Sequence, residues 1–95
     1  IARAAALGGQ ITAADFDAIH TAEVTPLSTR IAGLDIHEMP PATQGFAVLE
    51  MLNIVEQCAP VLGVDVAREG PRSPRYWHLM VEAKKLAYAD LERFN

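Results

Sequence analysis

Imidazole side chains that could bind a metal ion are few and far apart in this sequence of 95 residues. The histidines are His20, His37 and His78, and only His78 has, within one predicted helix, a carboxylate four residues later, at Glu82. Such a pair could be half of a metal site, but a stable centre needs three or four ligands and the sequence offers no further one nearby. We therefore predict surface or packing roles for these histidines, with no metal site and no cofactor.

Four further positions could take part in catalysis or binding, and each also has an ordinary structural interpretation. Cys58 lies in an apolar run, where burial raises the pKa of a thiol, so we predict packing rather than nucleophilic attack. Asn53 could contact a substrate, but we predict that it satisfies a buried backbone group. Thr43–Gly45 could bind an anion at a helix start, and we predict a plain helix cap. Trp77 is interpreted as a packing residue between elements.

Charge and composition narrow the classes of partner. The formal net charge is -4, and the acidic and basic residues are scattered along the chain. A nucleic-acid or anionic-membrane surface needs a basic patch, so we predict neither partner. No apolar run approaches the ~18–20 residues that span a bilayer, and the sequence opens at Ile1 without a signal-peptide pattern. Hydrophobic residues make up 51%, which is typical of a globular protein, and one cysteine does not assign a compartment.

The first part of the chain predicts short helices followed by a β-hairpin. Ile1–Leu7 is rich in alanine and meets two glycines, which is typical of the last turns of a helix that begins before the sequence does. Thr12, with an acidic residue three positions later, predicts the start of a second helix. β-forming residues on both sides of Gly33 predict a hairpin in which about 23–31 pairs with about 34–38.

Thr43–Cys58 predicts a helix whose apolar residues surround nearly the whole cylinder, and Ala59-Pro60 is expected to close it. Its polar side is a narrow stripe with Glu50, Asn53 and Gln57 at helical spacing. A helix of this kind is normally buried between layers, and one hairpin and one more helix cannot cover it on all sides. The chain is therefore expected to be a piece of a larger body or to pack heavily against another copy.

A loop over Val61–Arg72 and a long helix over Pro74–Phe94 are predicted to complete the chain. Ser73 suits the N-cap, and proline suits the first helical position because its missing N–H has no partner there. The predicted core-facing stripe of the helix recurs at spacings of four and three and contains Tyr76, Met80, Ala83, Ala87, Leu91 and Phe94. The two alanines at its centre predict the close approach of another helix, and Glu82 is expected to pair with Lys85.

An ordered set of short motifs resembles one known family. The set comprises Gly8-Gly9-Gln10-Ile11-Thr12, Asp15-Phe16, Pro26-Leu27, Gly33, Met39-Pro40-Pro41 with Gly45, Leu52-Asn53-Ile54-Val55-Glu56, His78-Leu79 and Glu82-Ala83-Lys84-Lys85-Leu86-Ala87-Tyr88-Ala89-Asp90. In this order it resembles the C-terminal part of the large subunit of gamma-glutamyltransferase (gamma-glutamyltranspeptidase). The likeness covers nearly all 95 residues but only a minority of a full-length member.

The resemblance implies an N-terminal nucleophile hydrolase, made as a precursor that cleaves itself into a large and a small subunit. A threonine freed at the start of the small subunit would attack the gamma-glutamyl carbonyl of glutathione or a similar donor, with its own α-amino group as the base. The threonines of this chain are all internal, at Thr12, Thr21, Thr25, Thr29 and Thr43. We therefore expect the nucleophile outside the chain and assign no catalytic and no substrate-binding residue within it. The expected partners are the remainder of the large subunit and the small catalytic subunit.

Residues 1–95 are thus predicted to form one incomplete segment of α+β class, with helices packed around a β-hairpin as part of an αββα fold. Its predicted role is a scaffold in a gamma-glutamyltransferase or glutathione hydrolase, inactive by itself. One alternative is a beta-lactam (cephalosporin) acylase-like amidase of the same superfamily, because Ala42–Gly45 lacks the serines and the double glycine of many members. A different class, a non-catalytic helical homodimerisation module, also fits the apolar helices.

Overall fold

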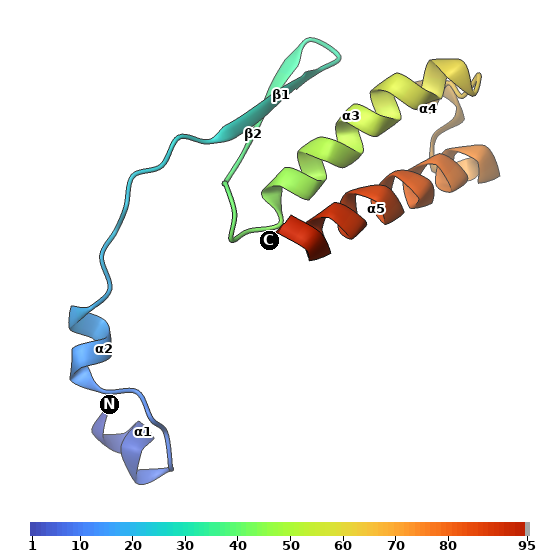
Figure 1. Cartoon of the computed structure of the whole chain (residues 1–95). Coiled ribbons are helices and arrows are strands. Elements are labelled where there is room, and N and C mark those ends of the chain that lie inside the picture. The colour runs from blue at the N-terminus through green and yellow to red at the C-terminus, as the bar shows by residue number, and fades with distance from the viewer. Residues whose placement is uncertain (95) are drawn as a thin grey trace.

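The computed structural model describes residues 1–94 and shows an α+β chain with an N-terminal arm and a helical body (Figure 1). The arm carries two short helices, and the body consists of a β-hairpin, two long helices and two short helical turns between them. In chain order the elements are α1 (Ala2–Ala6), α2 (Ala13–Asp17), β1 (Leu27–Ile31), β2 (Leu34–Glu38), α3 (Gly45–Val61), α4 (Val66–Glu69), the 3₁₀ turn η1 (Gly70–Arg72) and α5 (Pro74–Phe94).

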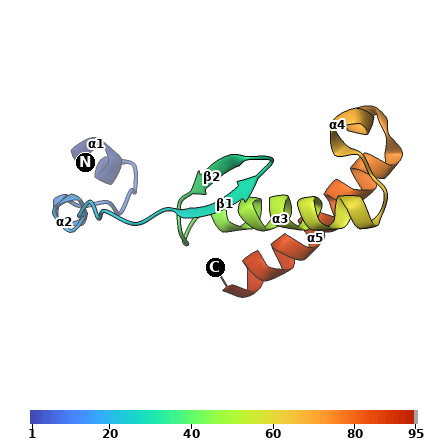
Figure 2. The ribbon, with the colours of Figure 1, turned by 90° about the horizontal axis from the view of Figure 1, so that it is seen from above.

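The N-terminal arm extends away from the body, and every residue from Ile1 to Ser28 is exposed (Figures 1 and 2). The predicted helix end is confirmed: Gly8 has a φ of +82° and its amide donates to the Ala5 carbonyl at 3.0 Å. At the start of α2 the Asp15 carboxylate accepts from the Thr12 amide at 2.7 Å, as the predicted cap requires. The radius of gyration is 19.8 Å, against roughly 12–13 Å for a compact chain of this length.

The two strands form an antiparallel hairpin closed by a two-residue turn. Ile31 faces Leu34 across the turn, and Ala32 and Gly33 have φ values of +49° and +81°. Positive φ at both turn positions matches the twist of the flanking strands, and glycine adopts it without steric cost. The predicted turn and the second strand are therefore confirmed.

The first strand is shorter than predicted, because it begins at Leu27 rather than near residue 23. The ladder ends where Leu27 faces Glu38, and Pro40 and Pro41 follow closely on the partner strand. Proline has no N–H to donate, so the second strand cannot continue and residues 23–26 have nothing to pair with.

Helix α3 runs to Val61, so the predicted stop at Ala59-Pro60 is wrong. The proline lies in the last turn, and the helix ends instead at Gly63, which has a φ of +62°. The Gly63 amide donates to the Pro60 carbonyl at 3.1 Å, and the Val64 amide donates to the Ala59 carbonyl at 2.8 Å. This pair of bonds is the Schellman termination, which needs a left-handed residue more than it needs a proline.

The segment predicted as a loop over Val61–Arg72 contains α4 and η1. Asp65 caps α4 by accepting from the Arg68 amide at 3.0 Å. This N-cap residue was missed because the glycines and the proline nearby favour a loop. Between α3 and the helical segment Val66–Arg72 the chain bends by 98°. Within residues 1–94 no single helix is long and apolar enough to cross a membrane. Only α3 and Val66–Arg72, taken together despite the bend, reach that length and hydrophobicity.

Helices α3 and α5 lie side by side and bury two small clusters (Figure 1). Ala83 and Ala87 are fully buried, which confirms the predicted close approach of another helix. The buried stripe of α5 is Leu79, Ala83, Ala87 and Leu91, a strict spacing of four. Tyr76 and Met80 are half-buried, and the prediction for Phe94 is wrong: it is 65% exposed, one turn after Leu91 packs on the first turn of α3.

The surface of α3 is covered on two sides only. Figure 2 shows the hairpin against one side and α5 against another, so the helices are not packed around the hairpin as predicted. Val48 and Val61 remain 43% and 85% exposed, and burial on all sides is not reached within the chain. The accessible surface is 7493 Å², against roughly 5,400 Å² for a folded monomer of 10.3 kDa. The chain alone therefore does not close a core.

Candidate functional site

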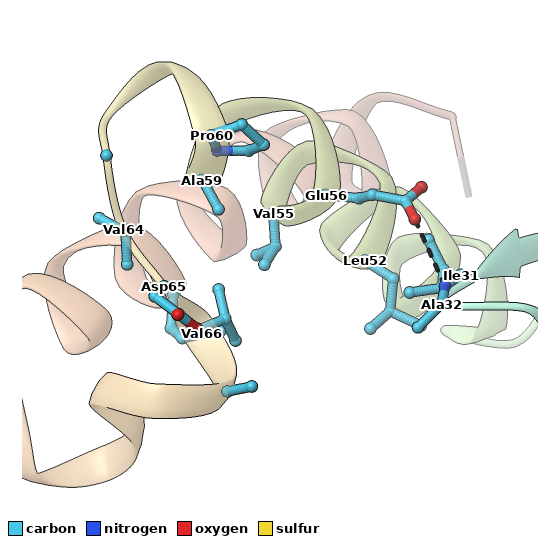
Figure 3. A pocket seen from close by; sticks show the side chains of 13 residues that line it. Ile31, Ala32, Leu52, Val55, Glu56, Ala59, Pro60, Val64, Asp65 and Val66 are labelled. Carbon is cyan, nitrogen blue, oxygen red and sulfur yellow. Dashed lines mark hydrogen bonds between the residues drawn. The ribbon is translucent and has the colours of Figure 1, made fainter.

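An apolar groove lies between α3, the tip of the hairpin and the start of α4 (Figure 3). Its volume is about 720 Å³. The lining residues are Ile31, Ala32, Leu52, Val55, Glu56, Ala59, Pro60, Gly63, Val64, Asp65, Val66, Ala67 and Met80. We call this surface the α3–α4 groove.

The sequence builds the α3–α4 groove from two local features. Leu52, Val55 and Ala59 are three and four residues apart, so they share one face of α3. The glycine termination after α3 then turns the chain back, so that Val64 and Val66 come to lie opposite that face (Figure 3). The groove was not predicted, because it depends on the helix end that the sequence analysis misplaced.

Two carboxylates, Glu56 and Asp65, are the charged side chains among the lining residues. Glu56 reaches the hairpin, where its Oε1 accepts from the Ala32 amide at 3.4 Å (Figure 3). Asp65 accepts from the first turn of α4, so both carboxylates have structural contacts. The other lining residues that the structure describes are Gly63 and residues with apolar side chains. The groove therefore suits an apolar group and supplies no thiol, hydroxyl or imidazole.

A second ionisable feature joins α3 to α5, where Glu50 faces Asp90. Partial burial raises the pKa of the Glu50 carboxyl, and a hydrogen bond and the negative charge of Asp90 raise it further. The sequence analysis placed Glu50 on a polar stripe and missed this contact, since nothing local in a sequence tells which positions of two helices face each other.

The histidines do not gather with other ligands in the structure. His20, His37 and His78 are all exposed, and across residues 1–94 no three His, Cys, Asp or Glu side chains are placed to hold a metal ion. Glu82 instead makes the predicted pair with Lys85, whose Nζ lies 2.9 Å from Glu82 Oε1. The hydrogen bond from Lys85 lowers the pKa of the Glu82 carboxyl.

Asn53 has a different partner from the one predicted. It is exposed, and its Oδ1 accepts from the Thr29 hydroxyl at 2.5 Å, so it ties β1 to α3 and does not satisfy a buried backbone group. Cys58 is partly buried and packs against the cluster of Ala59, Val64 and Leu79, in agreement with a packing role. Within the polar stripe of α3, Asn53 thus contacts the hairpin, while Glu50 faces α5.

The remaining two candidates also make structural contacts. The Thr43 hydroxyl donates toward the Met39 carbonyl at 3.0 Å and accepts from the Gly45 amide at 3.3 Å. Helix α3 begins at Gly45 rather than at the predicted Thr43, and Gln44 at its N-cap makes no side-chain cap bond, so Thr43 braces the turn before the helix instead of capping it. Trp77 Nε1 donates to the Pro71 carbonyl at 2.8 Å, so the ring ties η1 to α5 while 53% of the residue stays exposed.

Arg75 is a contact that the sequence analysis missed. Its Nη2 donates to the carbonyls of Leu62 and Gly63 at 2.7 and 2.8 Å, just after α3 ends. A cation at this place satisfies unpaired carbonyls and complements the negative end of the helix dipole. Glu69 lies on the other side of the guanidinium at 3.8 Å, and a hydrogen bond from Ser73 is the main cause that lowers the pKa of Glu69.

Comparison with known proteins gives the relationship of the chain. It is 34% identical over 88 residues to the glutathione hydrolase proenzyme of Escherichia coli, covering 92% of the chain and 14% of that protein. It is 32% identical over 83 residues to the glutathione hydrolase-like YwrD proenzyme of Bacillus subtilis, covering 87% of the chain and 15% of the relative. A glutathione hydrolase proenzyme of Pseudomonas sp. is 33% identical over 84 residues, with 87% and 14% covered.

The matches extend over almost the whole chain but over a small part of each relative. The chain spans about one seventh of the length of these curated relatives. A sequence model of the family described as gamma-glutamyltranspeptidase matches residues 1–94, which include the arm, the hairpin and both long helices. The chain therefore belongs to the gamma-glutamyltranspeptidase family, as its ordered motifs predicted.

Proposed function

We propose that the chain is a scaffold segment of an enzyme that hydrolyses or transfers the gamma-glutamyl group of glutathione. The observation that carries the proposal is the family match over residues 1–94, together with three relatives named as glutathione hydrolases or glutathione hydrolase-like. In this proposal the acyl-enzyme forms on a threonine outside the chain. The segment and the rest of the large subunit support the small subunit that carries that threonine.

The contacts of Thr12, Thr29 and Thr43 support a nucleophile elsewhere. The Thr29 hydroxyl donates to Asn53, and the Thr43 hydroxyl donates toward backbone carbonyls. The Thr12 hydroxyl donates to Asp15 Oδ2 at 2.8 Å. Two hydrogen bonds from Thr12, the backbone one foremost, lower the pKa of the Asp15 carboxyl, which makes it a weaker base. Thr29 and Thr43 therefore have structural partners that are not bases, and the carboxylate beside Thr12 is a weakened base in a helix cap.

The names of the relatives support the two-subunit arrangement. All three are called proenzymes, and a proenzyme is processed to reach its active form. The incomplete burial of α3 supports a segment that packs inside a larger protein, because a helix with this much apolar surface is ordinarily covered. The proposed partners of the chain are accordingly other parts of the same precursor.

The proposal is tested on the full-length protein that contains this segment. We expect it to cleave into two chains, with threonine first in the smaller one by N-terminal sequencing, and to release the chromophore from a gamma-glutamyl anilide. Glutathione and a glutaryl beta-lactam are assayed side by side, because the acylase alternative predicts turnover of the second only. Turnover by residues 1–95 alone would contradict the proposal, and so would failure of the full-length protein on both gamma-glutamyl anilide and glutathione.

A further inference from the structure

We infer that the α3–α4 groove receives an apolar segment carrying a basic residue, contributed by the same precursor polypeptide outside residues 1–95. The inference rests on the proposed function, because it requires this chain to be one part of a longer protein. It adds the place and the chemistry of one contact between the segment and the rest of that protein.

The shape and the lining of the groove specify an apolar occupant. Leu52 and Val55 of α3 and Val66 of α4 are each only partly buried and face the same space (Figure 3). Ala59 and Val64, which also line the groove, are buried and pack in one cluster with Leu79. Exposure of a hollowed apolar surface of this kind to water is unfavourable, and its burial under an aliphatic or aromatic side chain lowers the free energy.

The charges at the groove add a basic group to that description. Glu56 lies at the hairpin side and Asp65 at the α4 side, and no lysine or arginine is among the described lining residues. A lysine or arginine on the incoming segment would meet a carboxylate at either side of an apolar surface, where the attraction is screened less than in open water once the segment covers it. An incoming acidic residue would meet the same two charges with repulsion.

The same charges argue against a second copy of this chain as the occupant. A symmetric dimer places one patch against itself, so Glu56 and Asp65 of both copies would gather in one interface. The whole chain also carries a net charge of -4. By contrast, the relatives are about seven times as long as the matched segment, so the rest of such a polypeptide offers abundant surface at a high effective concentration.

Photo-crosslinking in the full-length protein tests the inference. The photoreactive residue p-benzoylphenylalanine replaces Ala67, which lines the groove and is exposed, and in a matched control it replaces Ala89, exposed on α5 outside the groove. We expect irradiation to join position 67 to a segment outside residues 1–95 of the same molecule, several-fold more than position 89. Mass spectrometry of the adduct is expected to find an apolar peptide with lysine or arginine. Adducts to a second copy, adducts confined to residues 1–95, or equal yields from both positions would overturn the inference.

A second measurement does not depend on the crosslinker. Ala67→Trp fills the groove from its own side, so it is expected to lower the melting temperature of the full-length protein, while Ala89→Trp leaves it unchanged. Equal melting temperatures would overturn the inference. Hydrolysis of gamma-glutamyl anilide is assayed separately on the unsubstituted protein. Activity without the specific crosslink contradicts the groove contact alone, and the crosslink without activity contradicts the proposed function alone.

Discussion

Ala87 lies in the interface between α3 and α5, and its replacement by leucine tests the packing of the two helices. The residue is fully buried, with an exposed fraction of 0%, and it packs in one cluster with Ala47 and Leu91. Leucine adds three carbon atoms where the two helices leave no room. Overpacking of this kind typically costs about 1–3 kcal/mol of unfolding free energy.

Ala89→Leu is the matched control, because Ala89 is exposed on the same helix and leucine and alanine have similar helix propensities. Its effect is expected to stay within about 0.5 kcal/mol. Both variants are compared in the full-length protein by urea unfolding and by thermal melting. Urea unfolding is followed by circular dichroism at 222 nm, which reports helix content.

A compensating substitution identifies the cause of the loss. Met51 is partly buried and packs against the same cluster, so Met51→Ala combined with Ala87→Leu is expected to recover part of the lost stability. If Ala87→Leu unfolds at the same urea concentration as Ala89→Leu, the two helices do not meet at Ala87 and the assigned core of the segment is wrong.

Three further predictions concern single contacts of the helical body. Arg75→Met removes the two hydrogen bonds to the carbonyls after α3 and is expected to cost about 1 kcal/mol, since the arginine is more than half exposed, while the exposed Arg72→Met changes little in the same urea titration. Glu50→Gln is expected to raise the melting temperature at neutral pH, because the raised pKa of Glu50 means that its charged form disfavours the fold. In the parent, stability is lost as the pH rises from the ordinary pKa of 4.5 through the raised pKa of the folded state. Melting between pH 4 and pH 8 should show this loss in the parent and in Glu92→Gln but less of it in Glu50→Gln, and parallel curves would refute it. Gly45→Ala places a Cβ 2.7 Å from a backbone carbonyl and is expected to lower the melting temperature, and a variant as stable as the parent would show that the chain before α3 can move aside.

The parts of the fold that the sequence predicts are those fixed within a few residues. Gly8 ends α1 and Gly33 turns the hairpin because each adopts a positive φ that the local chain requires. The end of α3 shows the limit of such reasoning, since Pro60 and Gly63 are both breaking signals three residues apart. The structure selects the glycine, because its left-handed conformation pairs the last carbonyls, whereas a proline in the last turn loses only one bond.

The contacts that sequence reasoning missed join residues far apart in the chain. Arg75 reaches carbonyls 12 and 13 residues earlier, and Glu50 meets Asp90 across the two long helices. Predicting either requires the register of α5 on α3, which depends on where α3 ends and on how α4 turns the chain. The α3–α4 groove depends on the same turn. The absence of an assigned catalytic residue in the chain stays a prediction, tested by the activity of residues 1–95 alone.

The exposed arm gives an independent energetic reason for the proposal that the chain packs against the rest of a larger protein. Its large apolar side chains are exposed to water to between 47% and 81%, at Ile1, Leu7, Ile11, Phe16, Ile19 and Val24. Burying one such side chain is worth about 1.5–3 kcal/mol, so leaving all of them in water forgoes an amount comparable to the ~5–15 kcal/mol net stability of a whole domain. Gly8 ends α1 and Thr12 caps α2, but these local contacts bury none of the apolar side chains. A surface that covered the arm would recover this free energy, which supports the proposal that the chain packs within a longer polypeptide of its family.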